Sequence, residues 1–247
     1  MDEVAGQGIM RRMSADVYHP TTLIAYRRLQ MLLHPVLAAL ARLTVLGLEN
    51  VPAEGGLLLT VNHLSLLDPP AVFLTVPRQG VVFLTSKHKR NPLFAYVART
   101  AGCIWVERGE PDRAALRAAL DVLKEGLMIG IAPEGTRSPT HDLQRAKTGA
   151  AYLATRARVP ILPAAIGGVE QIKRRIPWGW RTPATLAYGP VYRLPDDPRA
   201  KGEALETYTT EIMCRIAALL PEKYRGVYAD NPRVAELIAG KAGCPTR

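Results

Sequence analysis

Two side chains with complementary acid–base chemistry stand close together in the chain. His63 and Asp68 are five positions apart in the run NHLSLLD, which occupies residues 62–68. On one continuous helix this spacing would place them about 140° apart, at about 100° per residue, and they could not meet. Where the chain turns between them, the carboxylate can hold the imidazole in one tautomer, and the imidazole can serve as a general base for a hydroxyl group. Without a shared role, His63 would end a strand and Asp68 would cap a helix.

The segments on either side of this run predict such a turn. Residues 56–61 are short and largely apolar, which is typical of a buried strand. Asp68 is followed by Pro69, an order that is typical of a helix start because Asp can cap the helix and Pro fits its first turn. We therefore expect His63 to follow a strand and Asp68 to open and cap a helix.

Strand-like and helix-like segments alternate after Leu48, which favours an α/β fold with a mostly parallel central sheet flanked by helices. The expected strands are residues 56–62, 80–86, 102–107, 127–132, 161–166 and 184–191. The expected helices are residues 69–76, 91–100, 111–125, 147–157 and about 201–220, with a short helix between Pro232 and Gly240.

Apolar residues recur with helical spacing in an N-terminal stripe at residues 29–43. Polar residues and Pro35 interrupt the stripe, so it is too short to span a membrane. We expect an amphipathic helical anchor that lies in a membrane interface and contacts it through Leu33, Leu37 and Leu40. The alternative is a helix that packs on the protein's own core.

We divide the chain into three parts. Residues 1–45 are expected to form a tail with the helical anchor, residues 46–226 the main domain, and residues 227–247 a C-terminal tail that contains the short helix. No repeat or low-complexity linker divides the main domain, so its sheet and helices are expected to form one unit.

The chain carries a formal net charge of +10, with a pI near 9.8. This balance favours a polyanionic partner: nucleic acid, an anionic membrane surface or a phosphorylated ligand. No aromatic-rich RNA-binding signature is present, so we do not expect nucleic acid. The run KRRIPWGWR at residues 173–181 suits an anionic membrane surface, with Arg174, Arg175, Trp178 and Trp180 as the expected contacts. A basic loop whose tryptophans pack inward is the alternative.

The cysteines, Cys103, Cys214 and Cys244, lie far apart and show no paired spacing. This argues against a disulfide framework and against a zinc site, and we interpret them as reduced thiols in a cytosolic setting. We expect no metal ion and no redox cofactor.

Cations and hydroxyl groups follow several of the expected strands. Lys87, Arg108 and the run PEGTRS at residues 133–138 each come at or just after such a strand end. Because ligands gather beyond the carboxyl ends of parallel strands, these groups and His63 are expected to converge. In PEGTRS a glycine permits a tight turn, and an arginine between hydroxyl groups suits phosphate oxygens. The alternatives are an ordinary turn whose arginine pairs with a carboxylate, and solvated surface charges at Lys87 and Arg108.

Four segments in order resemble a known family. NHLSLLD at residues 62–68, GCIWVER at residues 102–108, PEGTRS at residues 133–138 and VPILP at residues 159–163 are similar to the ordered blocks of the glycerolipid acyltransferases that include 1-acylglycerol-3-phosphate acyltransferase. The resemblance covers about residues 45–225. One such block would be weak evidence, whereas four in order at these separations are highly specific.

The resemblance implies transfer of a fatty acyl group from a thioester, acyl-CoA or acyl carrier protein, to a hydroxyl of a lysophospholipid. The acceptor it favours is 1-acylglycerol 3-phosphate, which would give phosphatidate. It implies that His63 is the catalytic base and that Asp68 orients it, and that residues 159–163 line the acyl or acceptor pocket. The acceptor site that the family implies consists of Lys87, Arg108, Glu134, Gly135, Thr136 and Arg137.

Two positions depart from the family pattern. Ala132 stands where the family usually carries a large aromatic residue, and Trp105 stands where phenylalanine is common. The acceptor and the acyl-chain length therefore stay open. Alternative acceptors are glycerol 3-phosphate, another lysophospholipid, or a glycolipid or amino-acid lipid precursor, and a non-catalytic lipid-binding protein is a more distant alternative. The expected location is the cytoplasmic face of the cell membrane, as a peripheral or monotopic protein.

Overall fold

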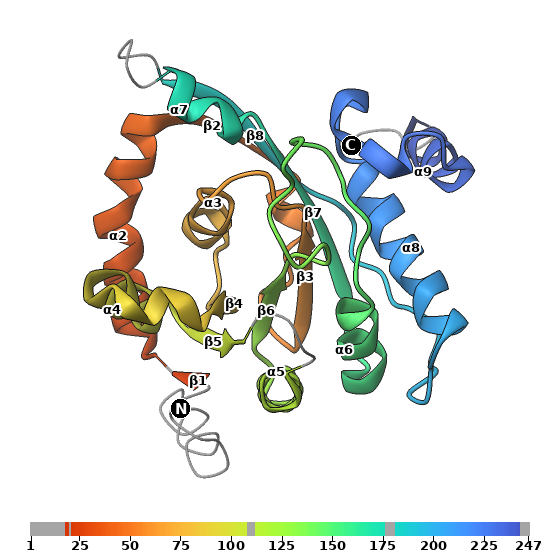
Figure 1. The fold of residues 1–247 in the computed structure, drawn as a ribbon, viewed down its shortest axis with the longest axis horizontal. Helices are drawn as coiled ribbons and strands as arrows, with labels where there is room; N and C mark the ends of the chain where they lie inside the picture. The colour runs from red at the N-terminus through yellow and green to blue at the C-terminus, as the bar shows by residue number, and fades with distance from the viewer. Residues whose placement is uncertain (1–17, 20, 108–111, 176–180, 243–247) are drawn as a thin grey trace.

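One sheet of eight strands runs through the described part of the chain (Figure 1). The computed structural model describes residues 18–19, 21–107, 112–175 and 181–242. The strands are β1 (Tyr18–His19), β2 (Ala41–Leu46), β3 (Leu57–Val61), β4 (Gly80–Thr85), β5 (Cys103–Val106), β6 (Met128–Ile131), β7 (Ile161–Gly167) and β8 (Thr182–Tyr188). Their order across the sheet is β1-β5-β4-β6-β3-β7-β8-β2. The pairs β1–β5 and β7–β8 are antiparallel and the other neighbours are parallel, so the prediction of a mostly parallel sheet is confirmed.

Helices cover both faces of the sheet. They are α2 (Leu23–Leu40), α3 (Asp68–Thr75), α4 (Pro92–Ala101), α5 (Arg113–Lys124), α6 (Gly149–Ala157), α7 (Ile172–Arg175), α8 (Glu203–Ala217) and α9 (Pro232–Ala242). In Figure 1, α2, α3 and α4 lie on one side of the sheet, and α5, α6 and α8 lie on the other, where α9 packs against α8. Each of the six expected strands and six expected helices overlaps an observed element, so those predictions are confirmed.

β3 lies in the middle of the sheet and leads directly to His63. Its residues Leu57, Leu58 and Leu59 are fully buried, because a parallel strand that helices cover on both faces has no side exposed to water. Leu57 and Leu59 pack in the apolar cluster beneath α3, whereas Leu58 packs with α5 and α6 on the other face. The end of β3 is therefore held in place by the apolar clusters on both faces of the sheet.

The prediction that the helical stripe continues to residue 43 is wrong, because the helix ends at Leu40. Residues Ala41–Leu46 form β2, which pairs in parallel with β8 along its whole length. The segment alternates between buried or half-buried and exposed positions, and β8 offers it unpaired backbone groups, so pairing outweighs the helical period of its leucines. The boundary expected between residues 45 and 46 falls inside this strand. None of the described helices is both long and apolar enough to cross a membrane.

Candidate active site

His63 and Asp68 meet at a turn between β3 and α3. Nδ1 of His63 lies 2.9 Å from Oδ2 of Asp68, and the side chains are 19% and 2% exposed, respectively. β3 ends at Val61 and Asp68 is the first residue of α3, so the predicted turn is confirmed. The prediction that Asp68 caps the helix is wrong. Its carboxylate turns back instead and accepts the backbone N–H groups of Leu64 at 2.6 Å and Ser65 at 2.7 Å.

The surroundings of Asp68 set the state of the pair. Burial raises the pKa of the Asp68 carboxyl, while the hydrogen bonds from His63, Ser65 and Leu64 act in the opposite direction. When Nδ1 of His63 donates its proton to Asp68, Nε2 is left as the acceptor nitrogen of the ring. The arrangement can therefore take a proton at Nε2 and stabilise the resulting cation at Nδ1.

The backbone around His63 is fixed from three directions. Its N–H donates to Oε1 of Glu134 at 3.0 Å, and its carbonyl accepts the N–H of Ser138 at 2.8 Å. The side chain of the preceding residue, Asn62, is buried and exchanges two hydrogen bonds of 2.8 Å with the backbone of Ile166. This amide continues the pairing of β3 with β7 beyond the last paired residue of the ladder, so the position at which His63 leaves the sheet is set.

Glu134 lies inside the protein and not on the surface of the site. It is 3% exposed, and its Oε2 accepts the backbone N–H of Gln144 at 2.9 Å. Burial raises the pKa of the Glu134 carboxyl, and the hydrogen bonds from Gln144 and His63 counteract that effect. Each carboxylate oxygen therefore accepts one backbone N–H inside the protein.

The other expected acceptor residues lie at the same edge of the sheet. Gly135, Thr136 and Arg137 form an exposed turn just after β6, with Gly135 at a φ of 71°. Lys87 is exposed just after β4, in a short 3-10 helix (Ser86–Arg90). Because β4, β6 and β3 are neighbouring parallel strands, their carboxyl ends bring these residues to the edge that carries His63.

The alternative of an ordinary turn predicts a carboxylate partner for the cations at this edge. Within the described residues, neither Lys87 nor Arg137 forms an ion pair with a carboxylate. Arg108 lies outside the described residues. The described residues also hold no group of three or more His, Cys, Asp or Glu side chains that could bind a metal ion.

A further cation, Lys147, was missed in the sequence. A Cβ atom on Gly135 would lie 3.3 Å from Cδ and 3.8 Å from Nζ of Lys147, so this side chain passes directly over the glycine. Its N–H donates to the carbonyl of Pro133 at 2.8 Å. The available signal was its place just before α6, because a helix that follows a parallel strand starts at the edge where that strand ends.

A family model described as Acyltransferase matches residues 42–167. The match covers half of the chain and includes His63, Asp68 and the turn at residues 133–138. The chain belongs to this acyltransferase family.

Two curated proteins illustrate how this acyltransferase relates to others. It is 31% identical over 127 residues to a 1-acyl-sn-glycerol-3-phosphate acyltransferase of Borreliella burgdorferi, with 51% of each chain covered. It is 26% identical over 121 residues to the protein of the same name from Bacillus subtilis, covering 49% of this chain and 60% of that one. The chain thus spans about half the length of the curated relatives it matches.

One solved structure shares the fold of this acyltransferase. It is the 1-acyl-sn-glycerophosphate (LPA) acyltransferase from Thermotoga maritima, with a TM-score of 0.61 and 22% sequence identity. The match covers 90% of this chain and 81% of that chain. At this identity the likeness concerns the arrangement of the sheet and helices.

The expected membrane contacts of this acyltransferase divide into buried and exposed residues. Leu37 is 8% exposed and packs in the cluster beneath α3, and Leu40 packs against the same cluster, so both face the core. Leu33 is half-buried. The prediction of Leu37 and Leu40 as membrane contacts is therefore wrong, because this stripe of α2 packs on the protein itself. On α7, Arg174 is exposed and Arg175 is half-buried; Trp178 and Trp180 lie outside the described residues.

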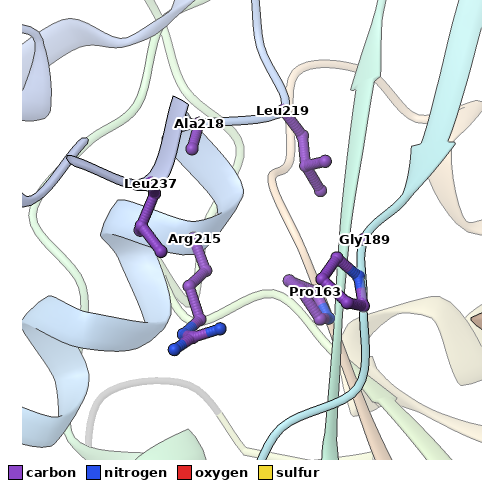
Figure 2. Close-up of a pocket in the computed structure, with 7 residues that line it drawn as sticks. Pro163, Gly189, Arg215, Ala218, Leu219 and Leu237 are labelled. Carbon is purple, nitrogen blue, oxygen red and sulfur yellow. The ribbon is translucent and has the colours of Figure 1, made fainter. Parts of the chain in front are cut away.

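A small cavity lies on the opposite face of the sheet from α3 (Figure 2). Pro163, Gly189 and Leu219 line it on one side and Arg215 and Leu237 on the other. Its volume of about 30 Å³ suffices for one or two water molecules. Pro163 belongs to the segment expected to line an acyl or acceptor pocket. This cavity is too small for either substrate, and the role of that segment stays a prediction.

Proposed function

We propose that the chain transfers a fatty acyl group from acyl-CoA or acyl carrier protein to the free hydroxyl of 1-acylglycerol 3-phosphate, giving phosphatidate. The observation that carries the proposal is the 2.9 Å contact between His63 Nδ1 and Asp68 Oδ2, at a sheet edge with cations that have no acidic partner among the described residues. The names of the curated relatives support the same reaction and the same acceptor.

The reaction needs one base and no covalent enzyme intermediate. Nε2 of His63 takes the proton of the acceptor hydroxyl while that oxygen attacks the thioester carbonyl carbon. Asp68 stabilises the imidazolium, and collapse of the tetrahedral intermediate breaks the carbon–sulfur bond. The imidazolium then returns its proton to the leaving thiolate, so the products are the ester and a free thiol. General-base help of this kind contributes about 10²–10⁴ in rate.

The phosphate of the acceptor would bind at the turn after β6. Arg137 offers a planar fork of donors and Thr136 offers a hydroxyl group, and both residues are exposed. We assign Lys87 and Lys147 to the same site because each brings a cation to this edge. Arg108 joins this set on the family resemblance alone.

A lipid acceptor also requires contact with a bilayer. The outer face of α2 exposes Ile24, Met31, Leu32 and Val36, opposite the stripe that packs on the core. The neighbouring helix α4 adds exposed apolar side chains, including Leu93. We propose that this α2–α4 face rests in the headgroup region of an anionic membrane, on its cytoplasmic side, as in a peripheral or monotopic protein. No cofactor is required by the proposed chemistry.

Other acceptors remain as the alternative within the same chemistry. Glycerol 3-phosphate, another lysophospholipid, and glycolipid or amino-acid lipid precursors all present a hydroxyl that His63 could deprotonate. The exposed cations Lys87, Arg137 and Lys147 favour a phosphorylated acceptor over a neutral one. A non-catalytic lipid-binding protein would have no use for a buried carboxylate that orients an accessible imidazole.

The test is release of free thiol from an acyl-CoA and from an acylated carrier protein. Wild type is assayed in detergent micelles with lysophosphatidate, glycerol 3-phosphate or lysophosphatidylcholine. We expect release with lysophosphatidate, and His63→Ala should lower kcat by about 10²–10⁴ while the unfolding midpoint is unchanged. His34→Ala, which alters an exposed histidine on α2, is the matched control and should keep full activity. Near-normal activity of His63→Ala would refute the mechanism, and a preference for another acceptor would change the proposed substrate.

A further inference from the structure

One short loop holds the peptide of His63 on both sides. Glu134 accepts the N–H of His63 at 3.0 Å, and the N–H of Ser138, four residues later, donates to the carbonyl of His63 at 2.8 Å. The backbone of His63 is therefore linked to the loop after β6 by one side-chain and one backbone hydrogen bond. A shift of residues 134–138 would move the imidazole with them.

One carboxylate oxygen of Glu134 accepts the N–H of His63, and the other accepts a hydrogen bond from its own loop. Oε2 accepts the N–H of Gln144 at 2.9 Å, and the side chain is 3% exposed. Within the described residues Glu134 forms no ion pair with lysine or arginine. Both oxygens face backbone donors inside the protein, and the side chain is almost completely buried, so it does not reach the hydroxyl or phosphate of an acceptor at the surface.

We infer that Glu134 is a positioning residue, which fixes the peptide of His63 so that Nδ1 stays on Asp68 and Nε2 faces the substrate. It is not a ligand of the acceptor, which is the role the family resemblance implies for it. The inference rests on the proposed function for its kinetic consequences, but the positioning of the imidazole can be measured without any substrate.

The geometry explains why a carboxylate is needed at this position. Each oxygen accepts one backbone N–H, and such charge-assisted hydrogen bonds are stronger than neutral ones. Glutamine at residue 134 would replace one acceptor with an NH₂ group, which would face an N–H donor and leave both unpaired. Aspartate would keep the charge, but its shorter side chain could reach only one of the two donors.

Steady-state kinetics separate positioning from binding. For Glu134→Gln we expect kcat for thiol release to fall about 10- to 100-fold, because an imidazole displaced by an ångström loses its alignment, while KM for lysophosphatidate changes less than about threefold. The kcat of Glu134→Asp should lie between those of Glu134→Gln and wild type. Arg137→Ala is the matched comparison and should raise KM much more than it lowers kcat. A rise in acceptor KM with unchanged kcat in Glu134→Gln would overturn the inference.

A readout on the imidazole itself completes the test. In ¹⁵N NMR spectra of the protein without substrate, the His63 ring signals, assigned by their loss in His63→Ala, should show the Nδ1–H tautomer in wild type. In Glu134→Gln we expect a mixture of tautomers. If the ring signals do not change while kcat falls, the positioning role is wrong.

The two proposals can fail separately. If wild type releases no thiol with any acceptor but the ring signals still respond to Glu134→Gln, the proposed function fails and the positioning holds. If Glu134→Gln does not fold, the same kinetic and NMR measurements on Glu134→Asp decide, with an unchanged tautomer and unchanged kcat counting against the inference.

Discussion

At the scale of single residues, the carboxylate of Asp68 is used unevenly. Oδ2 accepts the hydrogen bonds from His63, Leu64 and Ser65, whereas the buried Oδ1 has no hydrogen-bond partner among the described residues. A buried carboxylate with an incomplete set of donors gains from any positive charge placed beside it. The imidazolium that forms on His63 in the proposed mechanism is such a charge. The environment of Asp68 therefore favours the state that the reaction must pass through.

Lys147 gives a prediction at the same scale. Its ammonium lies over Gly135, so Lys147→Ala should raise KM for lysophosphatidate about tenfold, the equivalent of about 1.4 kcal/mol, with a smaller change in kcat. The difference from wild type should shrink at high salt, since the lysine is exposed. Steady-state kinetics at two salt concentrations measure both effects. Lys201→Ala, an exposed lysine just before α8, should leave KM unchanged; an equal KM in Lys147→Ala and wild type would remove Lys147 from the site.

The residues of the site differ in how far the sequence could predict them. His63 and Asp68 are five positions apart, and the apolar run before them and the proline after them predict their turn locally. The donors to Glu134 lie 71 and 10 positions away, and nothing in the run PEGTRS indicates that its acid points inward. A motif identifies which residues matter, but their direction depends on contacts made by distant parts of the chain.

At the scale of elements, the loop that holds His63 is itself held by a segment near the C-terminus. Leu143 is fully buried; its N–H donates to the carbonyl of Tyr224 at 2.9 Å, and its carbonyl accepts the N–H of Val227 at 3.2 Å. Two 3-10 turns, Glu222–Tyr224 and Gly226–Tyr228, supply these partners. The C-terminal tail was expected to start at residue 227, and its first residue takes part in this contact.

Gly226 allows that contact and provides a prediction. Its φ is 48°, and a Cβ atom there would lie 2.1 Å from the carbonyl oxygen of Leu143. Gly226→Ala should lower the free energy of unfolding by about 1–3 kcal/mol and lower kcat, because the loop must move away. Urea unfolding and thiol release measure these effects. Gly240→Ala, in open space within α9, should instead be neutral or stabilising by about 0.5–1 kcal/mol. An unchanged unfolding midpoint in Gly226→Ala would show that this contact is dispensable.

Elements were predictable where their signals are local. β3 to β7 each coincide with a largely apolar run that has glycine, proline or polar residues at its ends, and β8 alternates between buried and exposed positions. β2 could not be predicted in this way, because its six residues form a strand only beside the edge of β8, more than a hundred positions later. The order of the strands likewise could not be predicted from any single segment. It depends on which strand edges remain available for pairing during folding.

At the scale of the whole molecule, the proposed membrane contact rests on the net charge of +10 and on the exposed apolar residues of the α2–α4 face. Met31 and Leu32 are 69% and 70% exposed, so the double change Met31→Ser, Leu32→Ser removes apolar surface without disturbing the core. We expect the affinity for vesicles to fall about tenfold or more. The part of each side chain that enters the bilayer contributes of order 1 kcal/mol to the free energy of binding. The unfolding midpoint should be unchanged.

Co-sedimentation with vesicles that contain phosphatidylglycerol measures this effect. Leu46→Ser is the matched control, because Leu46 is also exposed but lies on the edge strand β2. Its binding should equal that of wild type. Equal binding of the double variant and wild type would show that another face meets the membrane.

The hydrogen bonds of Leu143 with Tyr224 and Val227 also matter during synthesis of the chain, because their partners are made late. Synthesis proceeds at about 5–20 residues per second, so Tyr224 is added roughly 8–32 s after His63. During that interval the nascent chain already contains His63 and the turn at residues 135–137, but not the segment that holds the loop after β6. We therefore expect the emerging polypeptide to gain acyltransferase activity only after residues 222–228 have left the exit tunnel.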